Sequence, residues 1–289
     1  MADTVEMQDI RGLDIDKAVK GFALAEYVFK SDCTQSSTSA DSIRWYQETA
    51  ADLTATAPSY VANISPLSGF PTLEVSWTRQ TSYIKKFAAE GFISMEDMKS
   101  ADVDVVARTL LRLTRSVVKQ VDTAIWDVMS ENRTVVNINS VTTNAAWNVA
   151  SWTGVDIIED LMDAKYQISL NNYSPEGASL YLSPLDYKSM VTWLISSKGS
   201  SIPNFSSEKV STGTVMQLLG LNIKVSPNVT ASYALVIVPQ QACTWKSYTD
   251  TTSRAIEEPG IGTKFRVWEL GIPYLTDPKA VCLIKDTQD

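Results

Sequence analysis

Histidine is absent from all 289 residues of the chain. Its absence excludes the Ser-His-Asp triad, the Cys-His nucleophile pair, histidine-based zinc sites and any imidazole proton shuttle. The GxxxxGK[ST] phosphate loop is also missing, and Gly260-Ile261-Gly262 lacks the third glycine of a dinucleotide-binding fingerprint. We interpret these glycines as a turn before a strand, and we expect no catalytic residue, no cofactor and no metal.

Long apolar runs and disulfide patterns are scarce as well. The strongest apolar run, Ala234 to Val238, is far shorter than the roughly 20 residues that a membrane helix needs. The N-terminus lacks the basic and apolar regions of a secretory signal. The three cysteines, Cys33, Cys243 and Cys282, are odd in number and widely spaced. We therefore expect reduced thiols in a cytoplasm and no contact with a membrane.

The charge and apolar content describe an ordinary acidic globular chain. Lysine and arginine number 25 against 33 aspartates and glutamates, a formal net charge of -8, and 44% of the residues are hydrophobic. This balance argues against a protein whose whole surface binds nucleic acid or anionic lipid. It predicts a sizeable core built from a mixture of α and β structure.

The first 42 residues look loosely organised. A possible helix from Asp14 to Phe29 leads into a polar run, Ser31 to Ser39, that has little apolar content to bury. This composition predicts a flexible or externally supported arm.

Residues 43–84 are expected to be extended. Leu73, Val75 and Trp77 alternate with polar residues, which is typical of a strand with one covered face, and residues 60–64 are its expected partner. An isolated two-stranded hairpin is marginally stable in water, so a projecting one needs cover from elsewhere.

A long amphipathic helix is the strongest local signal. From about Asp102 to Glu131, apolar residues recur at steps of three and four, which predicts a helix of roughly 45 Å. A capping-box pattern, Ser94 to Asp97, opens a short helix before it. The apolar positions are Val103, Val106, Leu110, Leu113, Val117, Val121, Ala124 and Val128.

A basic stripe runs along the opposite face of the long helix. Its members follow one another at steps of four, three and four: Arg108, Arg112, Arg115 and Lys119. Three interpretations stay open: a solvated face, a contact with an acidic surface of a neighbouring subunit, or a contact with nucleic-acid phosphates.

The remaining chain alternates between helices and strands. A second capping box, Thr153 to Asp156, is expected to begin a helix that ends near Asn172, and Ser183-Pro184 caps a third helix reaching about Ser196. We expect a helical turn at residues 216–220. Two final strands, 264–274 and 280–285, are expected to be joined at Thr276-Asp277-Pro278.

Tryptophan is numerous, with eight residues in the chain. Most are expected in the core. Trp45 and Trp77 lie in the expected extended segment, and since tryptophan is enriched at interfaces we regard them, with Tyr60 and Leu73, as candidates for contact with another subunit.

Three local stretches, in order along the chain, resemble the HK97-like major capsid proteins of tailed bacteriophages. They are Leu180 to Tyr187 (strand, Ser-Pro, helix), Leu218 to Ser226 (Leu-Leu-Gly before a strand) and Phe265 to Ile284 with its Pro278-x-Ala280. The succession of polar arm, hairpin, long helix, mixed α/β region and final strands is also similar to that family.

The resemblance implies an α+β HK97-like capsid fold. Its expected parts are an N-terminal arm (1–42), an E-loop (43–84), a P-domain (85–151) with a spine helix (102–131), an A-domain (152–261) and closing P-domain strands (262–289). It implies a major capsid protein that self-assembles into pentamers and hexamers of an icosahedral shell around double-stranded DNA, without sequence-specific contact to that DNA. Portal, scaffolding and decoration proteins are the further implied partners, and the virion, assembled in the host cytoplasm, is the implied location.

The chain departs from some relatives in one respect. Residues 43–80 contain no lysine, and the nearest are Lys85 and Lys86. The covalent cross-linking through an E-loop lysine that certain relatives use is therefore not expected, and the shell should be held noncovalently.

Three alternatives stay open at this point. An encapsulin-type nanocompartment shares the fold and the self-assembly but encloses cargo protein. A hydrolase with paired carboxylates in a cleft of the 152–260 region would need only two acids. A tail-structural protein or adhesin would form rods or rings instead of closed shells.

Overall fold

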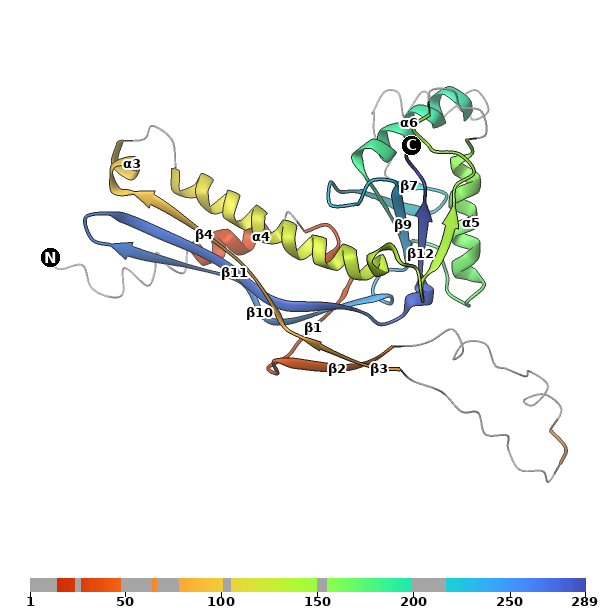
Figure 1. Cartoon of the computed structure of the whole chain (residues 1–289), viewed down its shortest axis with the longest axis horizontal. Helices are drawn as coiled ribbons and strands as arrows, with labels where there is room; N and C mark the ends of the chain where they lie inside the picture. Colours follow the sequence, from red (N-terminus) through yellow and green to blue (C-terminus); the bar gives the residue numbers. More distant parts are fainter. Residues whose placement is uncertain are drawn as a thin grey trace.

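Three sheets and one long helix organise the chain. The computed structural model describes residues 15–23, 27–47, 64–66, 78–100, 105–149, 155–198 and 217–289. Figure 1 shows an elongated arrangement, in which a long helix lies along a long narrow sheet and a more compact α/β unit stands at one end of both.

The long sheet contains four strands in the order β1-β10-β11-β4. Their bounds are β1 Thr34–Ser37, β10 Cys243–Glu258, β11 Gly262–Leu275 and β4 Lys85–Ser94. β11 is antiparallel to both β10 and β4, and β1 is parallel to β10. The sequence did not predict β10, because its Thr- and Ser-rich stretch alternates poorly and its register shifts between Ser247 and Thr252.

The predicted long helix is confirmed as α4 (Val105–Met129). It packs on β4 and β11, and its periodic apolar residues, such as Leu110, Val117 and Val121, are buried. Gly91 in β4 permits this close packing, because a Cβ there would lie 3.1 Å from the Leu113 side chain. The short helix before it is α3 (Met95–Ser100), with Ser94 Oγ accepting the Asp97 N–H as the capping box predicts.

The C-terminal end predicted for the long helix is wrong. α4 stops at Met129, and Glu131, Asn132 and Arg133 of η3 (Glu131–Arg133) have positive φ angles of 46°, 50° and 67°, which no α-helix tolerates. The Glu131 carboxylate turns back and accepts the N–H groups of Val136 and Asn137, at 2.8 Å each. These hydrogen bonds stabilise the non-helical turn after Ser130, so α4 does not continue beyond Met129.

The compact unit is a six-stranded mixed sheet in the order β5-β12-β9-β6-β8-β7. α5 packs on β5 and β12, and α6 follows β6. The bounds are β5 Asn139–Thr142, α5 Ile157–Ser169, β6 Ser179–Leu182, α6 Pro184–Trp193, η4 Leu194–Lys198, β7 Gln217–Leu218, β8 Leu221–Val225, β9 Tyr233–Ile237, η5 Pro278–Ala280 and β12 Val281–Lys285. β6, β9 and β12 are almost wholly buried and form the centre of the core.

Two local predictions in this unit are wrong and one is confirmed. The second helix begins at Ile157, and its N-cap is Asp156, which accepts the Glu159 N–H. The capping-box pattern instead predicts Thr153 as the N-cap and Asp156 within the first turn. Residues 216–220 are expected to form a helical turn, but Gln217 and Leu218 form strand β7, which pairs with β8. The Ser183 cap with Pro184 in the first turn is confirmed in α6.

The final two strands are not neighbours. β11 belongs to the long sheet, whereas β12 pairs with β5 and β9 of the compact unit. The chain changes direction at Thr276 and Asp277, whose N–H groups both donate to the Ala242 carbonyl, and then passes through η5. The residues of β10 fall within the expected A-domain range, 152–261, and β10 pairs with β1 and β11 of the long sheet. The expected domain bounds stay a prediction.

A separate two-stranded sheet completes the fold. β2 (Ser42–Gln47) and β3 (Thr78–Tyr83) pair antiparallel and lie beside the long sheet in Figure 1, with β3 leading directly into β4. Extended structure is thus confirmed at both ends of the 43–84 segment. Tyr60, Leu73 and Trp77, with the predicted strand pairing between them, lie outside the described residues.

Candidate assembly surfaces

The base of the β2–β3 hairpin is anchored on its own molecule through an aromatic contact. Trp45 of β2 packs against Tyr274 of β11, with ring centroids 5.0 Å apart, and Ile43 is buried. Tyr46, the next residue of β2, is 56% exposed, and Tyr83, which pairs with Ser42 at the other end of the sheet, is 72% exposed. The anchored base therefore presents an aromatic surface that the described part of the chain does not cover.

A groove of about 380 Å³ lies beside this hairpin base. Trp45 and Tyr274 line one part of it, and Val128 of α4 and Val136 line another. Val136 is 76% exposed, since the turn after α4 holds it outward. The groove combines these apolar side chains with polar ones such as Asp127 and Asn137, as protein–protein interfaces do.

The basic stripe on α4 faces away from the core. Arg108, Arg112, Arg115 and Lys119 are all exposed, whereas the opposite side of the helix is buried. The structure thus brings the four cations together on one solvent-facing line, as predicted. A neighbouring subunit or nucleic acid as their partner stays a prediction.

The far end of the long sheet carries a second apolar surface. Phe92, Met98 and Ile261 are exposed, and they come from β4, α3 and the turn between β10 and β11. These three segments meet at the same end of the molecule in Figure 1, opposite the compact unit. Sequence reasoning missed this surface because its residues lie far apart along the chain.

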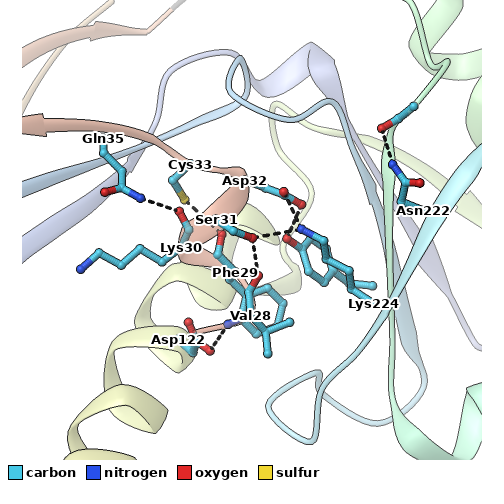
Figure 2. A network of polar contacts seen from close by, with 12 residues as sticks. Val28, Phe29, Lys30, Ser31, Asp32, Cys33, Gln35, Asp122, Asn222 and Lys224 are labelled. Atoms are coloured by element: carbon cyan, nitrogen blue, oxygen red, sulfur yellow. Dashed lines mark hydrogen bonds and ion pairs between the residues drawn. The ribbon is translucent and has the colours of Figure 1, made fainter. Parts of the chain in front are cut away.

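The N-terminal segment is the largest departure from the sequence-based expectation. Residues 27–37, which we call the strap, were expected in a loose arm, yet Phe29, Asp32 and Cys33 are buried. Phe29 lies between Trp126 of α4 and Tyr181 of β6, at ring-centroid distances of 5.8 and 4.6 Å. The strap therefore packs between the long helix and the compact unit (Figure 2).

Polar contacts tie the strap to the long sheet and its helix. Lys30 Nζ lies 2.6 Å from Glu269 Oε1, and Tyr27 Oη donates to the same carboxylate. The Val28 N–H donates to Asp122 Oδ2 of α4 at 3.0 Å. Because Glu269 is fully buried, its negative charge needs a paired cation, and the Lys30 ammonium provides that cation.

A second set of contacts ties the strap to the compact unit. Asp32 lies in η1 (Lys30–Asp32) and accepts from Tyr181 Oη at 2.5 Å and from Lys224 Nζ of β8 at 2.6 Å. The Gln240 N–H donates to the Asp32 carbonyl at 2.7 Å. Figure 2 shows Asp32 directed toward Lys224 and Val28 toward Asp122, on opposite sides of the same short segment.

Asp122, Asp160 and Asp186 are buried carboxylates that accept hydrogen bonds from other groups of the fold. Burial raises the pKa of Asp122 to about 6, against backbone hydrogen bonds that lower it. Burial also raises the pKa of Asp160 to about 6, and this side chain accepts from the Trp147 indole at 2.8 Å. Asp186 accepts from Ser183 Oγ. In the described part of the 152–260 region, the two buried acids, Asp160 and Asp186, each accept from a structural donor, which gives the carboxylate-pair alternative no support there.

Metal and membrane sites find no support among the described residues. No group of three acidic or cysteine side chains is placed to hold a metal ion in that part of the chain. Nor does any helix within it have the length and apolar content to cross a bilayer.

A long helix packed along a narrow sheet, a separate α/β unit and the two-stranded sheet of β2 and β3 together define an HK97-like capsid fold. The model of the phage capsid protein family matches residues 78–284, which covers most of the chain. The chain belongs to this family, and it is a structural component of a phage capsid. A search of curated protein sequences finds no match.

Solved structures give the same fold. The capsid structure of cyanophage P-SCSP1u aligns with a TM-score of 0.68 at 14% identity, covering 90% of this chain and 88% of that one. The mature capsid of bacteriophage PhiM1 gives 0.64 at 12% identity, covering 90% and 86%. A virus-like particle from Pyrococcus furiosus gives 0.62 at 12% identity, covering 95% and 99%.

Proposed function

We propose that this chain is the major capsid protein of its virion and self-assembles into the pentamers and hexamers of an icosahedral shell. The observation that carries this proposal is the family match together with the full-length similarity of fold to proteins solved in capsids. The exposed apolar and aromatic surfaces at both ends of the long sheet support it, because they need cover from other chains.

The surfaces suit a head-to-tail arrangement of copies. The groove at the hairpin base and the apolar end with Phe92 and Ile261 lie at opposite ends of the long sheet, so each copy can contact different neighbours through each. Pairing of such unlike surfaces gives closed rings when the rotation from one copy to the next divides a full turn evenly. A protein–protein interface of ordinary size buries about 1,200–2,000 Å², and we expect several segments to contribute to each contact.

The proposed contents of the shell are double-stranded DNA held without sequence-specific contact. The overall charge of -8 supports weak binding at most, and the stripe on α4 is the concentrated basic feature of the described residues. Portal, scaffolding and decoration proteins are the further proposed partners, and assembly in the host cytoplasm is the proposed route.

Electron microscopy of the concentrated purified chain tests self-assembly. We expect closed shells, capsomers or curved sheets, with fivefold and sixfold rings in class averages. A compact monomer under every salt, pH and crowding condition would contradict the proposal. Rods or stacked rings would instead indicate a tail-structural protein.

The full-length similarity to a virus-like particle keeps a cargo compartment as the second candidate. The contents of particles isolated from the producing cell separate the two. Nuclease-protected double-stranded DNA inside the particles supports the capsid, whereas a single enriched protein and no DNA would support the compartment.

A further inference from the structure

Two cysteines that are far apart in sequence lie side by side in the fold. β1 and β10 are parallel, with Thr34 opposite Thr244, so the preceding residues, Cys33 and Cys243, also face one another. Opposite residues on adjacent strands point to the same face, and such strands are about 4.8 Å apart. Disulfides need Cα atoms roughly 4.4–6.8 Å apart, so the backbone already provides the spacing.

The two thiols touch inside the protein. Cys33 is 3% exposed and Cys243 is fully buried. A hydrogen bond with Cys243, together with burial, raises the pKa of the Cys33 thiol well above its ordinary value. Cys33 Sγ also donates to the Phe29 carbonyl at 3.6 Å, a contact within the strap itself (Figure 2).

A pocket lies beside one of the two cysteines. Its volume is about 400 Å³, and it is lined by Ser31, Cys33, Thr34, Gln35 and Gln240. Cys33 therefore faces the pocket, whereas Cys243 lies behind it and is absent from its lining. The third cysteine, Cys282, lies in β12 of the other sheet.

We propose that Cys33 and Cys243 form a reversible disulfide that ties the strap to β10, with Cys33 as the sulfur oxidised first and Cys243 as the resolving sulfur. Hydrogen peroxide is the class of oxidant that fits the pocket. The Cys33 thiolate attacks one peroxide oxygen, the O–O bond breaks, hydroxide leaves, and Cys33 becomes a sulfenic acid. The Cys243 sulfur then attacks Cys33, the S–O bond breaks, and the leaving hydroxide takes the Cys243 proton as water.

The bond would fix the point where the strap leaves the compact unit. Cys33 directly follows Asp32, which already bonds to Tyr181 and Lys224, so oxidation adds a covalent link to an existing anchor. Only its timing rests on the proposed function: a capsid protein folds in a reducing cytoplasm and meets oxidants after release.

Mass spectrometry of the reduced full-length chain treated with hydrogen peroxide tests the site. We expect the intact mass to fall by about 2 Da, the loss of two hydrogens. Free thiols measured after denaturation should fall from three to one, a linked peptide should join Cys33 to Cys243, and dithiothreitol should reverse the change. The reaction should accelerate as the pH rises, because the thiolate is the reactive form.

Single serine variants assign the roles of the sulfurs. Cys282→Ser is the matched control and should oxidise like the unmodified chain. Cys243→Ser should accumulate a sulfenic acid on Cys33 that dimedone traps, and Cys33→Ser should show neither the trap nor the mass loss. An unchanged mass under conditions that oxidise the urea-unfolded chain, or a link through Cys282, would overturn the proposal. Both measurements use the unassembled chain, so failure here leaves the capsid function untouched.

Discussion

Asp122 is a residue whose ionisation opposes folding. Its pKa is raised by burial from 3.8 to about 6, and Lys30 lowers it while Glu269 raises it. The folded state therefore binds the proton more tightly than the unfolded chain does. The resulting stabilisation is fully present below about pH 4 and is lost as the pH rises through about 6.

We expect Asp122→Asn to raise the free energy of unfolding at pH 7 by about 1–3 kcal/mol, since two pKa units correspond to about 3 kcal/mol at most. The neutral amide oxygen can still accept the Val28 N–H. Urea unfolding between pH 4 and 7 should show a smaller pH dependence in the variant than in the unmodified chain. Asp127→Asn, at a half-buried position of the same helix whose carboxylate pairs with Arg133, is the control; an equal change in both variants would contradict this assignment.

Lys30 and Glu269 form the other residue-scale test. Lys30→Met removes the cation 2.6 Å from a fully buried carboxylate, and we expect a loss of about 3 kcal/mol in the free energy of unfolding. Glu269→Gln in the same chain should recover most of the loss, because no uncompensated charge then remains. If the double variant loses the sum of the unfolding free energies lost by Lys30→Met and by Glu269→Gln alone, the pair does not interact as the structure indicates.

Residue-scale prediction from sequence succeeded where the signal is local. The Ser94 and Ser183 caps follow from a side-chain oxygen placed before a helix, and the α4 stripe follows from helical spacing alone. Asp32 looked like part of a polar linker, because its partners Tyr181 and Lys224 lie well over a hundred residues away. Nothing in the surrounding Lys-Ser-Asp-Cys indicates that the carboxylate is buried.

At the scale of elements, α4 has one face in the core and one charged face outside. We expect Arg108→Glu with Arg112→Glu to impair assembly while leaving the subunit folded, provided the stripe meets an acidic neighbour. Light scattering follows assembly, and circular dichroism follows the fold.

The neutral pair Arg108→Gln with Arg112→Gln separates charge from side-chain packing, and it should give an intermediate defect that salt reduces. If the charge-reversed chain assembles at the normal rate and to the normal size, the stripe is a solvated face.

Strand prediction was weaker than helix prediction for a physical reason. A helix is recognised from residues three and four apart, whereas β10 and β11 are stabilised by partners on other strands. The sequence predicts strands at 264–274 and 280–285, but not that a turn at Thr276 and Asp277 sends them to different sheets. The sheet to which a strand belongs depends on long-range contacts that one sequence does not display.

At the scale of the whole molecule, the strap links the long sheet and the compact unit, so that we expect the two to unfold together. Phe29 contacts Trp126 on one side and Tyr181 on the other, and hydrogen bonds extend in both directions. Phe29→Ala should cost about 3–5 kcal/mol of unfolding free energy, as removal of a buried phenylalanine side chain usually does.

Hydrogen exchange shows where that loss is felt. We expect faster amide exchange in both the C-terminal half of α4 and in β6, because the same side chain supports both. Phe265→Ala, a buried phenylalanine within the long sheet, is the matched control and should speed exchange mainly in that sheet. Faster exchange on one side alone in Phe29→Ala would show that the strap does not couple the two units.

The strap also determines when the subunit can finish folding. Its residues emerge early from the ribosome, but Lys224, Gln240 and Glu269, which hold them, are synthesised almost 200 residues later or more. The hairpin and α4 are therefore made before their N-terminal support can dock, and loop closure over such a span is slow. The strap can therefore dock completely only after Glu269 has been made, and we expect products truncated before this residue to lack the docked strap.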